Sequence, residues 1–199
     1  MILHTKTYEA PPVSHREILR YAGCDVPDAS VMELMESCLT EAAGALTYKV
    51  CWRELDVSVR GDQCEFDVFS LSSRQLARNL DGCRRAILFA ATVGVGIDRL
   101  ITKYSHIAPS RALMMQAIGA ERIEALCDAF VTGWETENRT KLRPRFSPGY
   151  GDLPLESQKD IIALLDTPKQ IGLSLNDSLL MSPTKSVTAF AGITNTRQL

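Results

Sequence analysis

Apolar residues recur every three or four positions in the first part of the chain, which is the spacing of one face of an α-helix. Ser14 and Glu17 form a capping box at the start of "SHREILRYAG", so a first helix is predicted there. A second capping box, Ser30 with Glu33, precedes a longer amphipathic stretch that reaches residue 45. The sequence therefore predicts two consecutive helices near the N-terminus.

After Trp52 the apolar residues alternate with polar ones, which is the period of a strand with one wet face. Two such runs flank "RGDQ" at residues 60–63 and predict a β-hairpin. Farther along, "AILFAATVG" at residues 86–94 is apolar without alternation, so this strand is expected to be buried on both faces.

The rest of the chain alternates between helical and strand-like segments. Helices are predicted over residues 73–82, 96–106, 110–137, 155–166 and 167–172. Strand-like runs at residues 178–181 and 186–193 flank "SPTK", which predicts a hairpin turn. We predict an α+β fold, a mainly antiparallel twisted sheet flanked by helices, in a single domain over residues 1–199.

Composition narrows the class of partner. The net charge of −2, from 22 basic and 24 acidic residues, argues against nucleic acid or an anionic membrane as the main partner. The six cysteines form no C-x-x-C pair and indicate buried reduced thiols. The N-terminus lacks the pattern of a signal peptide, and no window is apolar enough for a membrane helix. A cytoplasmic protein that binds a small molecule or another protein is expected.

The loop over residues 143–154, "RPRFSPGYGDLP", is longer than the usual connection of about four to six residues. Arg145 offers a planar fork of donors that suits a carboxylate or a phosphate. Pro148 stiffens the loop, Gly149 lets a ligand approach the backbone, and Tyr150 supplies a ring face for a cation. This set indicates a ligand with a carboxylate and a fixed positive charge, and a plain surface turn is the alternative.

Three other features are weaker candidates. Gly94 and Gly96 imitate the entry of a dinucleotide site, but Arg99 replaces the third glycine of that fingerprint, and a tight turn between strand and helix explains the two glycines better. Glu121, Glu124 and Asp128 form an acidic row that can hold an amine or a sulfonium, although such a row is normally solvated. The three histidines show no metal-ligand spacing, so neither a metal site nor a catalytic residue is predicted.

The loop and the C-terminal segments together carry a family resemblance. The chain reads Arg145-Phe146-Ser147-Pro148-Gly149-Tyr150, then "ESQKDIIALLD", "TPKQIGLSLNDSLLM" and "MSPTKSVT". The order and spacing of these pieces resemble the activation (reactivation) domain of vitamin B12-dependent methionine synthase, and the earlier part of the chain is similar to free-standing, single-domain relatives of it. The resemblance implies the fold of that domain.

The resemblance also implies a ligand and its contacts. The family binds S-adenosylmethionine, so Arg145 is expected to bind the α-carboxylate and Glu124 the amino group. Backbone groups at Ser147 and Gly149 are expected to reach the ligand, and Tyr150 to form a wall of its pocket. The resemblance also expects an aromatic contact from the last strand, where this chain has Ala191.

By resemblance, the protein is a component of cobalamin-dependent methionine synthase and not an independent enzyme. It presents the methyl donor for reductive methylation of cob(II)alamin. The cobalamin is expected on a partner synthase chain, because the Asp-x-His-x-x-Gly ligand motif is absent here. A flavodoxin-like protein is the expected electron donor. Two alternatives stay open: a docking module for corrinoid methyltransferases whose S-adenosylmethionine site has decayed, and a nucleotide-dependent enzyme that uses the turn at Gly94 and Gly96.

Overall fold

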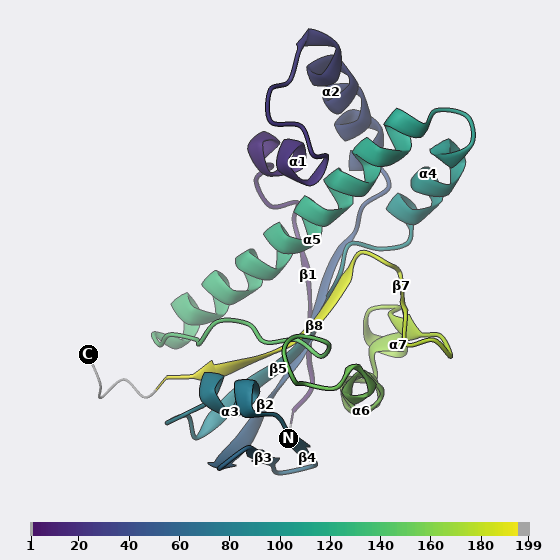
Figure 1. Ribbon diagram of the computed structural model, residues 1–199. Coiled ribbons are helices and arrows are strands. Elements are labelled where there is room, and N and C mark those ends of the chain that lie inside the picture. Colours follow the sequence, from purple (N-terminus) through teal and green to yellow (C-terminus); the bar gives the residue numbers. More distant parts are fainter. Residues whose placement is uncertain (1, 195–199) are drawn as a thin grey trace.

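The sheet is the centre of the computed structural model, which describes residues 2–194 (Figure 1). Its strands follow the order β4-β3-β2-β5-β8, β1 pairs with the free edge of β2, and every pairing is antiparallel. The strands of this sheet are β1 His4–Tyr8, β2 Tyr48–Arg60, β3 Gln63–Phe66, β4 Ser70–Ser72, β5 Arg85–Thr92 and β8 Ser186–Ile193. The expected α+β fold with an antiparallel sheet is confirmed.

Helices cover both faces of this sheet (Figure 1). On one face lie α1 His15–Tyr21, α2 Ala29–Ala43, α4 Gly96–Ser105 and the long α5 Pro109–Asn138. The other face carries α3 Arg74–Asn79, the 3₁₀ turn η1 Leu155–Ser157, α6 Gln158–Leu165 and α7 Thr167–Gln170. A separate two-stranded ribbon pairs β6 Ser174–Leu175 with β7 Met181–Ser182.

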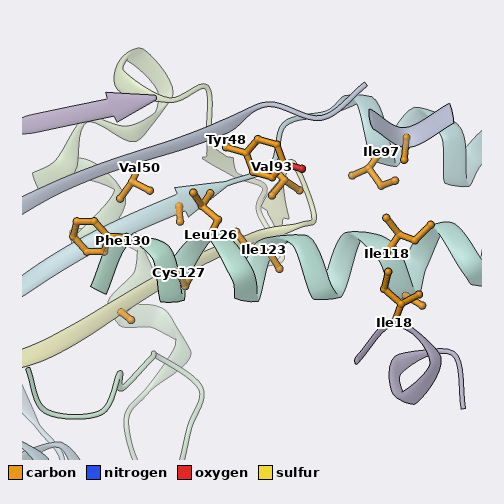
Figure 2. Close-up of a cluster of buried hydrophobic side chains, with 14 of the residues drawn as sticks. Ile18, Tyr48, Val50, Val93, Ile97, Ile118, Ile123, Leu126, Cys127 and Phe130 are labelled. Carbon is orange, nitrogen blue, oxygen red and sulfur yellow. The ribbon is translucent and has the colours of Figure 1, made fainter. Parts of the chain in front are cut away.

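The sheet separates two hydrophobic clusters. Figure 2 shows the cluster beneath α5, where Leu126 and Phe130 point toward Val50 of β2. In β5, Phe89 belongs to this cluster and its neighbour Leu88 to the opposite one. Residues Ala86 to Thr92 are all buried, so the prediction that this strand is buried on both faces is confirmed.

One of the two predicted helix starts is correct. Ser14 caps α1, and its hydroxyl accepts a hydrogen bond from the Glu17 N–H at 3.4 Å. The second prediction was wrong, because Asp28 and not Ser30 caps α2, accepting from the Val31 N–H at 2.9 Å. A carboxylate is an equally good N-cap, and here it also accepts a hydrogen bond from the Ser30 hydroxyl at 2.8 Å.

The predicted hairpin around residues 60–63 is present as β2 and β3. β2 nevertheless starts at Tyr48, earlier than the alternation indicates, because its first half pairs with β1 on one edge and β5 on the other. That half is enclosed, so its residues do not alternate between buried and exposed positions. β1, which is mostly exposed, was not predicted at all.

The predicted hairpin across "SPTK" was wrong. β7 pairs with β6, whereas β8 joins the main sheet and pairs with β5 over its full length. The long apolar β8 finds a buried partner in β5, and the short, partly exposed β7 does not enter the sheet. This arrangement makes β8 an edge strand of the main sheet.

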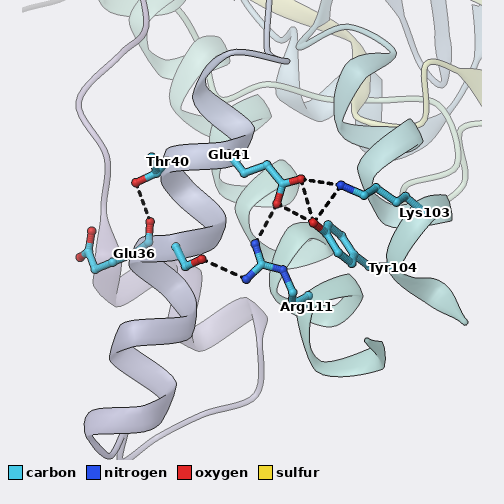
Figure 3. Close-up of polar contacts among 7 residues, drawn as sticks. Glu36, Thr40, Glu41, Lys103, Tyr104 and Arg111 are labelled. Atoms are coloured by element: carbon cyan, nitrogen blue, oxygen red, sulfur yellow. Dashed lines mark hydrogen bonds and ion pairs between the residues drawn. The ribbon is translucent and has the colours of Figure 1, made fainter. Parts of the chain in front are cut away.

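A polar network joins three helices near the start of α5, at the end that lies far from the loop over residues 143–154 (Figure 1 and Figure 3). The Glu41 carboxylate of α2 accepts hydrogen bonds from Lys103 and Tyr104 of α4, at 3.0 and 2.8 Å, and from Arg111 of α5 at 2.8 Å. One carboxylate thus links three helices.

A buried ion pair ties α5 to the segment before α1. Arg122 donates to the Glu121 carboxylate at 2.6 Å and to the backbone carbonyls of Pro11 and Pro12 at 2.6 and 2.7 Å. The Ser14 N–H also donates to Glu121, at 3.0 Å. The first member of the acidic row is therefore buried, and it holds the N-terminal segment against α5.

Candidate functional site

The loop that follows α5 covers only half of the outer edge of β8. Phe146 exchanges two backbone hydrogen bonds with Phe190, of 2.9 and 2.8 Å. Pro148, which has no N–H to donate, stands where the next pair would form, and the chain turns away there. The edge of β8 from Ser186 to Thr188 consequently faces a cavity and not a neighbouring strand.

This cavity has a volume of about 470 Å³ and lies between the loop, α5, the start of α6 and β8. It brings together four of the five residues predicted to bind a ligand, together with polar residues that the sequence did not single out. Its polar lining includes Glu124, Arg145, Ser147, Tyr150, Gln158 and Thr188. Segments far apart in the sequence thus form one site.

Arg145 reaches from the loop to α5. Its Nη2 donates to Glu124 Oε2 and to Asp128 Oδ1, both at 2.9 Å, and its side chain is 24% exposed. Burial opposes the charge, but the neighbouring Cys127, Glu124 and Asp128 outweigh it and raise the pKa of Arg145. Beneath it, burial raises the pKa of the Cys127 thiol to about 12. The site therefore carries a permanent cation between two carboxylates.

The Pro-Gly part of the loop forms a tight turn. The Tyr150 N–H donates to the Ser147 carbonyl at 3.2 Å, and the Gly149 N–H donates to the Leu153 carbonyl at 2.9 Å. Gly149 adopts a φ of 85°, which a side chain disfavours. Of the five predicted residues, Gly149 is the one outside the cavity lining, whereas Tyr150 lines the cavity and is 70% exposed.

Asp152 fixes the far end of the loop, a role that sequence reasoning missed. Its carboxylate accepts hydrogen bonds from the Ser73 hydroxyl at 2.6 Å and from the N–H groups of Arg74 and Gln75 at 2.9 and 3.2 Å. The hydrogen bond from Ser73 is the largest cause that lowers the pKa of Asp152. Asp152 lies at the start of α3 in space but far from it in the sequence, so no neighbouring residues in the sequence indicate this contact.

Gln158 and Thr188 are the other residues that sequence reasoning missed. Gln158 begins α6 and Thr188 lies in β8, and each is buried while lining the cavity. Both lie inside segments that carry the family resemblance, but neither stands out by residue type. Only their placement at the cavity distinguishes them.

The last strand supplies no aromatic ring to the cavity among its lining residues. Ala191 is fully buried, and so is the ring of Phe190, which stacks on Phe66 at a centroid distance of 5.1 Å. The aromatic residues that line the cavity are Tyr150 and Phe146, and both come from the loop.

The two glycines after β5 serve packing. A side-chain carbon at Gly94 would clash with Thr47, and one at Gly96 would clash with the Ala45 carbonyl. β5 also runs between two antiparallel partners, so the parallel strands of a dinucleotide-binding unit are not formed around it. This turn holds the start of α4 close to residues 45–47, which precede β2.

Neither a metal-binding cluster nor a membrane-spanning helix occurs among residues 2–194. No group of three or more His, Cys, Asp or Glu side chains in that range is placed to hold a metal ion. No helix in the same range has the length and apolarity needed to cross a membrane.

Comparisons with known proteins agree with this fold. The model of a family described as vitamin B12 dependent methionine synthase, activation domain, matches residues 80–197. The chain is also similar to a crystal structure of the MetH reactivation domain bound to AdoHcy, with a TM-score of 0.74 and 14% sequence identity. That match covers 100% of this chain and 80% of the other. No curated protein matches the sequence. At this identity, the structural likeness shows a shared fold.

Proposed function

This chain belongs to the family of vitamin B12 dependent methionine synthase activation domains, and from this premise we propose that it binds S-adenosylmethionine in the cavity beside Arg145. The observation that carries the proposal is the guanidinium of Arg145 at the wall of a cavity that also contains Glu124 and Tyr150. The fold of the MetH reactivation domain bound to AdoHcy, the demethylated product, supports it.

The residues present fit such a ligand. S-adenosylmethionine carries an α-carboxylate, an α-ammonium and a sulfonium. The guanidinium of Arg145 can bind the carboxylate, and the carboxylate of Glu124 can bind the ammonium. The volume of about 470 Å³ lies within the range of small-molecule sites, about 300–1,000 Å³. Tyr150 offers a ring face to a positive charge.

In this proposal Arg145 binds the carboxylate of the ligand while it still contacts a carboxylate of α5. Both hydrogen bonds to the α5 carboxylates leave from Nη2, and a guanidinium has five N–H donors in a planar fork. A ligand carboxylate can therefore use the remaining donors while Glu124 turns to the ammonium. Asp128 would then keep the arginine in place.

The role of the chain in this proposal is to position the ligand. When bound, S-adenosylmethionine supplies an electrophilic methyl group for the reductive methylation of cob(II)alamin. The chain holds the amino-acid end at Arg145 and Glu124, and it confines the rest of the ligand between the loop and β8. Such positioning replaces a bimolecular encounter by a pre-oriented one, so no acid or base of this chain is required.

We propose that the cobalamin is carried by a methionine synthase chain, on which this chain docks as a component and not as an independent enzyme. A flavodoxin-like protein is the proposed electron donor. The six cysteines are free thiols, which fits a reducing compartment, and we place the complex in the cytoplasm.

Isothermal titration calorimetry with S-adenosylmethionine and S-adenosylhomocysteine tests the proposal. The wild-type chain is expected to bind both, and Arg145→Ala to weaken binding about 10- to 100-fold, because a hydrogen bond to a charged group contributes about 1.5–3 kcal/mol. Arg143→Ala is the matched control, since Arg143 lies in the same loop, is exposed and is outside the cavity lining. Folded wild-type protein that gives no heat at millimolar ligand would refute the proposal.

The alternative, a docking module whose ligand site has decayed, is favoured by two observations. Arg145 already has two carboxylate partners, and the buried Phe190 is not among the residues that line the cavity. A module of this kind would bind a corrinoid-carrying methyltransferase with an affinity that S-adenosylmethionine and Arg145→Ala leave unchanged. If S-adenosylmethionine or Arg145→Ala changes the affinity for the methyltransferase, this alternative is excluded.

A further inference from the structure

Two buried oxygen atoms, each in a residue that lines the cavity, have no hydrogen-bond partner among residues 2–194. They are Oε1 of Gln158, a residue that is 5% exposed, and Oγ1 of Thr188, which is 1% exposed. Three more buried side-chain atoms also lack a hydrogen-bond partner, in Arg53, Asn79 and Arg111, but none of these residues lines the cavity. The two oxygens are thus set apart by their location.

An unpaired buried polar atom is costly. Leaving such a donor or acceptor without a partner costs about 1–3 kcal/mol, and the great majority of buried polar atoms in folded proteins are paired. Gln158 is held by its place at the start of α6, and Thr188 by the pairing of β8 with β5. Neither side chain is on a flexible segment that would let it turn to solvent.

The two oxygens come from α6 and β8, whereas the carboxylates that hold Arg145 come from α5. Side chains alternate along β8: Ala189 packs on the α5 side of the sheet, whereas Phe190 packs on the α6 side. By this alternation Thr188 shares the α6 side, where Gln158 also lies. Arg145 instead reaches Glu124 on the α5 side. The cavity is therefore lined by charged groups from the loop and α5 and by neutral polar groups from α6 and β8.

We propose that Gln158 and Thr188 form the subsite for the nucleoside half of the ligand, and this inference rests on the proposed function. The amide oxygen of Gln158 only accepts hydrogen bonds, and the hydroxyl of Thr188 both donates and accepts. A neutral group with its own donors, such as a ribose hydroxyl or the exocyclic amine of a purine, satisfies both. A second carboxylate would not, because it offers Gln158 no donor.

The backbone of β8 adds to this subsite. Phe190 directs its N–H and its carbonyl toward the outer edge, where they bond to Phe146. In an antiparallel pair, every second residue directs these groups to the same edge, so those of Thr188 also point outward, into the part of the edge that the loop leaves open. Side chain and backbone of Thr188 thus present polar groups to one ligand.

Two nearly isosteric variants, Thr188→Val and Gln158→Met, test the inference against two probes. S-adenosylhomocysteine has both halves of the proposed ligand, and 5′-methylthioadenosine lacks the amino-acid half. Each variant is expected to bind both probes about tenfold more weakly, the effect of one lost hydrogen bond. Arg145→Ala is expected to weaken S-adenosylhomocysteine alone, because 5′-methylthioadenosine has no carboxylate.

Thermal unfolding of the ligand-free protein separates a ligand contact from a structural one. Removing an unpaired hydroxyl is favourable, so Thr188→Val is expected to raise the Tm of the ligand-free protein while it lowers affinity. Thr167→Val is the matched control, because the buried Thr167 hydroxyl donates to the Leu173 carbonyl at 2.6 Å and lies outside the cavity lining. That variant is expected to lower the Tm and leave affinity unchanged.

The outcomes distinguish this inference from the proposed function. If the wild type binds both probes and the two variants bind within twofold of it, the nucleoside subsite is overturned while the proposed function stands. A wild-type chain that binds neither probe overturns both. Parallel loss of affinity for both probes, with a raised Tm for Thr188→Val, supports the subsite.

Discussion

Arg145 and Gly149 come from the same six-residue motif but serve different purposes. Arg145 lines the cavity and contacts α5, so its chemistry is available to a ligand. Gly149 instead permits the backbone to turn with a φ of 85° and lies outside the cavity lining. Its predicted contact with a ligand stays a prediction, whereas its contribution to the turn follows from its conformation.

Alanine substitutions at two glycines should therefore change stability in opposite directions. Gly149→Ala is expected to lower the free energy of unfolding by about 1 kcal/mol, because an L-residue is strained in the left-handed region. Gly133→Ala, inside α5, is expected to raise it by about 0.5–1 kcal/mol, since alanine is the better helix former and nothing lies within 4 Å of the added carbon. Urea unfolding measures both, and equal effects at the two glycines would contradict the prediction.

The long helix α5 connects the two ends of the molecule. Near its start, Arg111 joins the network around Glu41, and near its middle Glu124 and Asp128 contact the loop. Between them, the buried pair of Glu121 and Arg122 holds the segment before α1. Removal of one member of such a pair is strongly destabilising because it leaves a buried charge without a partner.

The Glu41 network predicts how stability depends on pH. Hydrogen bonds from Arg111, Lys103 and Tyr104 lower the pKa of Glu41 to about 2, from an ordinary value of 4.5. The unfolded chain therefore takes up this proton at a higher pH than the folded one, and the stabilisation is complete above pH 4.5 and lost as the pH falls toward 2. The network is partly exposed, and solvent screening limits its contribution.

Glu41→Gln is expected to lower the free energy of unfolding at pH 7 by about 1–2 kcal/mol and to flatten its decline at acidic pH. Urea unfolding at several pH values measures both effects. Glu33→Gln, at an exposed glutamate of the same helix, is the control and should leave the decline unchanged. A Glu41→Gln variant with the wild-type pH dependence would show that the network contributes no stability.

The two hydrophobic clusters on either side of the sheet account for the state of the cysteines. All six are free, and five of them are buried, with Cys24 partly exposed. Cys38 and Cys127 belong to the cluster beneath α5, and Cys51 and Cys64 to the opposite one. Burial raises the pKa of Cys51 to about 12 and that of Cys64 to about 11. These thiols are protonated and shielded in the folded molecule.

A colorimetric thiol reagent at pH 8 should therefore detect about one reactive cysteine per native chain, Cys24, and all six in denaturant. Cys24→Ser is the control and should abolish the fast reaction. The slow reaction of the buried thiols would report the opening of the whole molecule. Fast labelling of two or more thiols in the native Cys24→Ser protein would contradict this packing.

The sequence alone determined the features that depend on neighbouring residues. The Ser14 cap, the hairpin turn at Gly61 and the doubly buried strand β5 follow from local spacing, because capping, turn geometry and periodicity act over a few residues. The motif from Arg145 to Tyr150 likewise identified the loop that lines the cavity. The resemblance that it carried agreed with the family comparison and with the fold.

Only the tertiary structure decided which distant segments meet. The pairing of β8 with β5 and of β7 with β6 is set by burial of whole strand faces, which no local pattern records. The same is true of the place of Asp152 at the start of α3, and of Gln158 and Thr188 in the lining of one cavity. A glutamine or threonine in water bonds to the solvent, and it requires a protein or ligand partner only when the fold buries it. The sequence therefore does not show which of these residues lacks a partner.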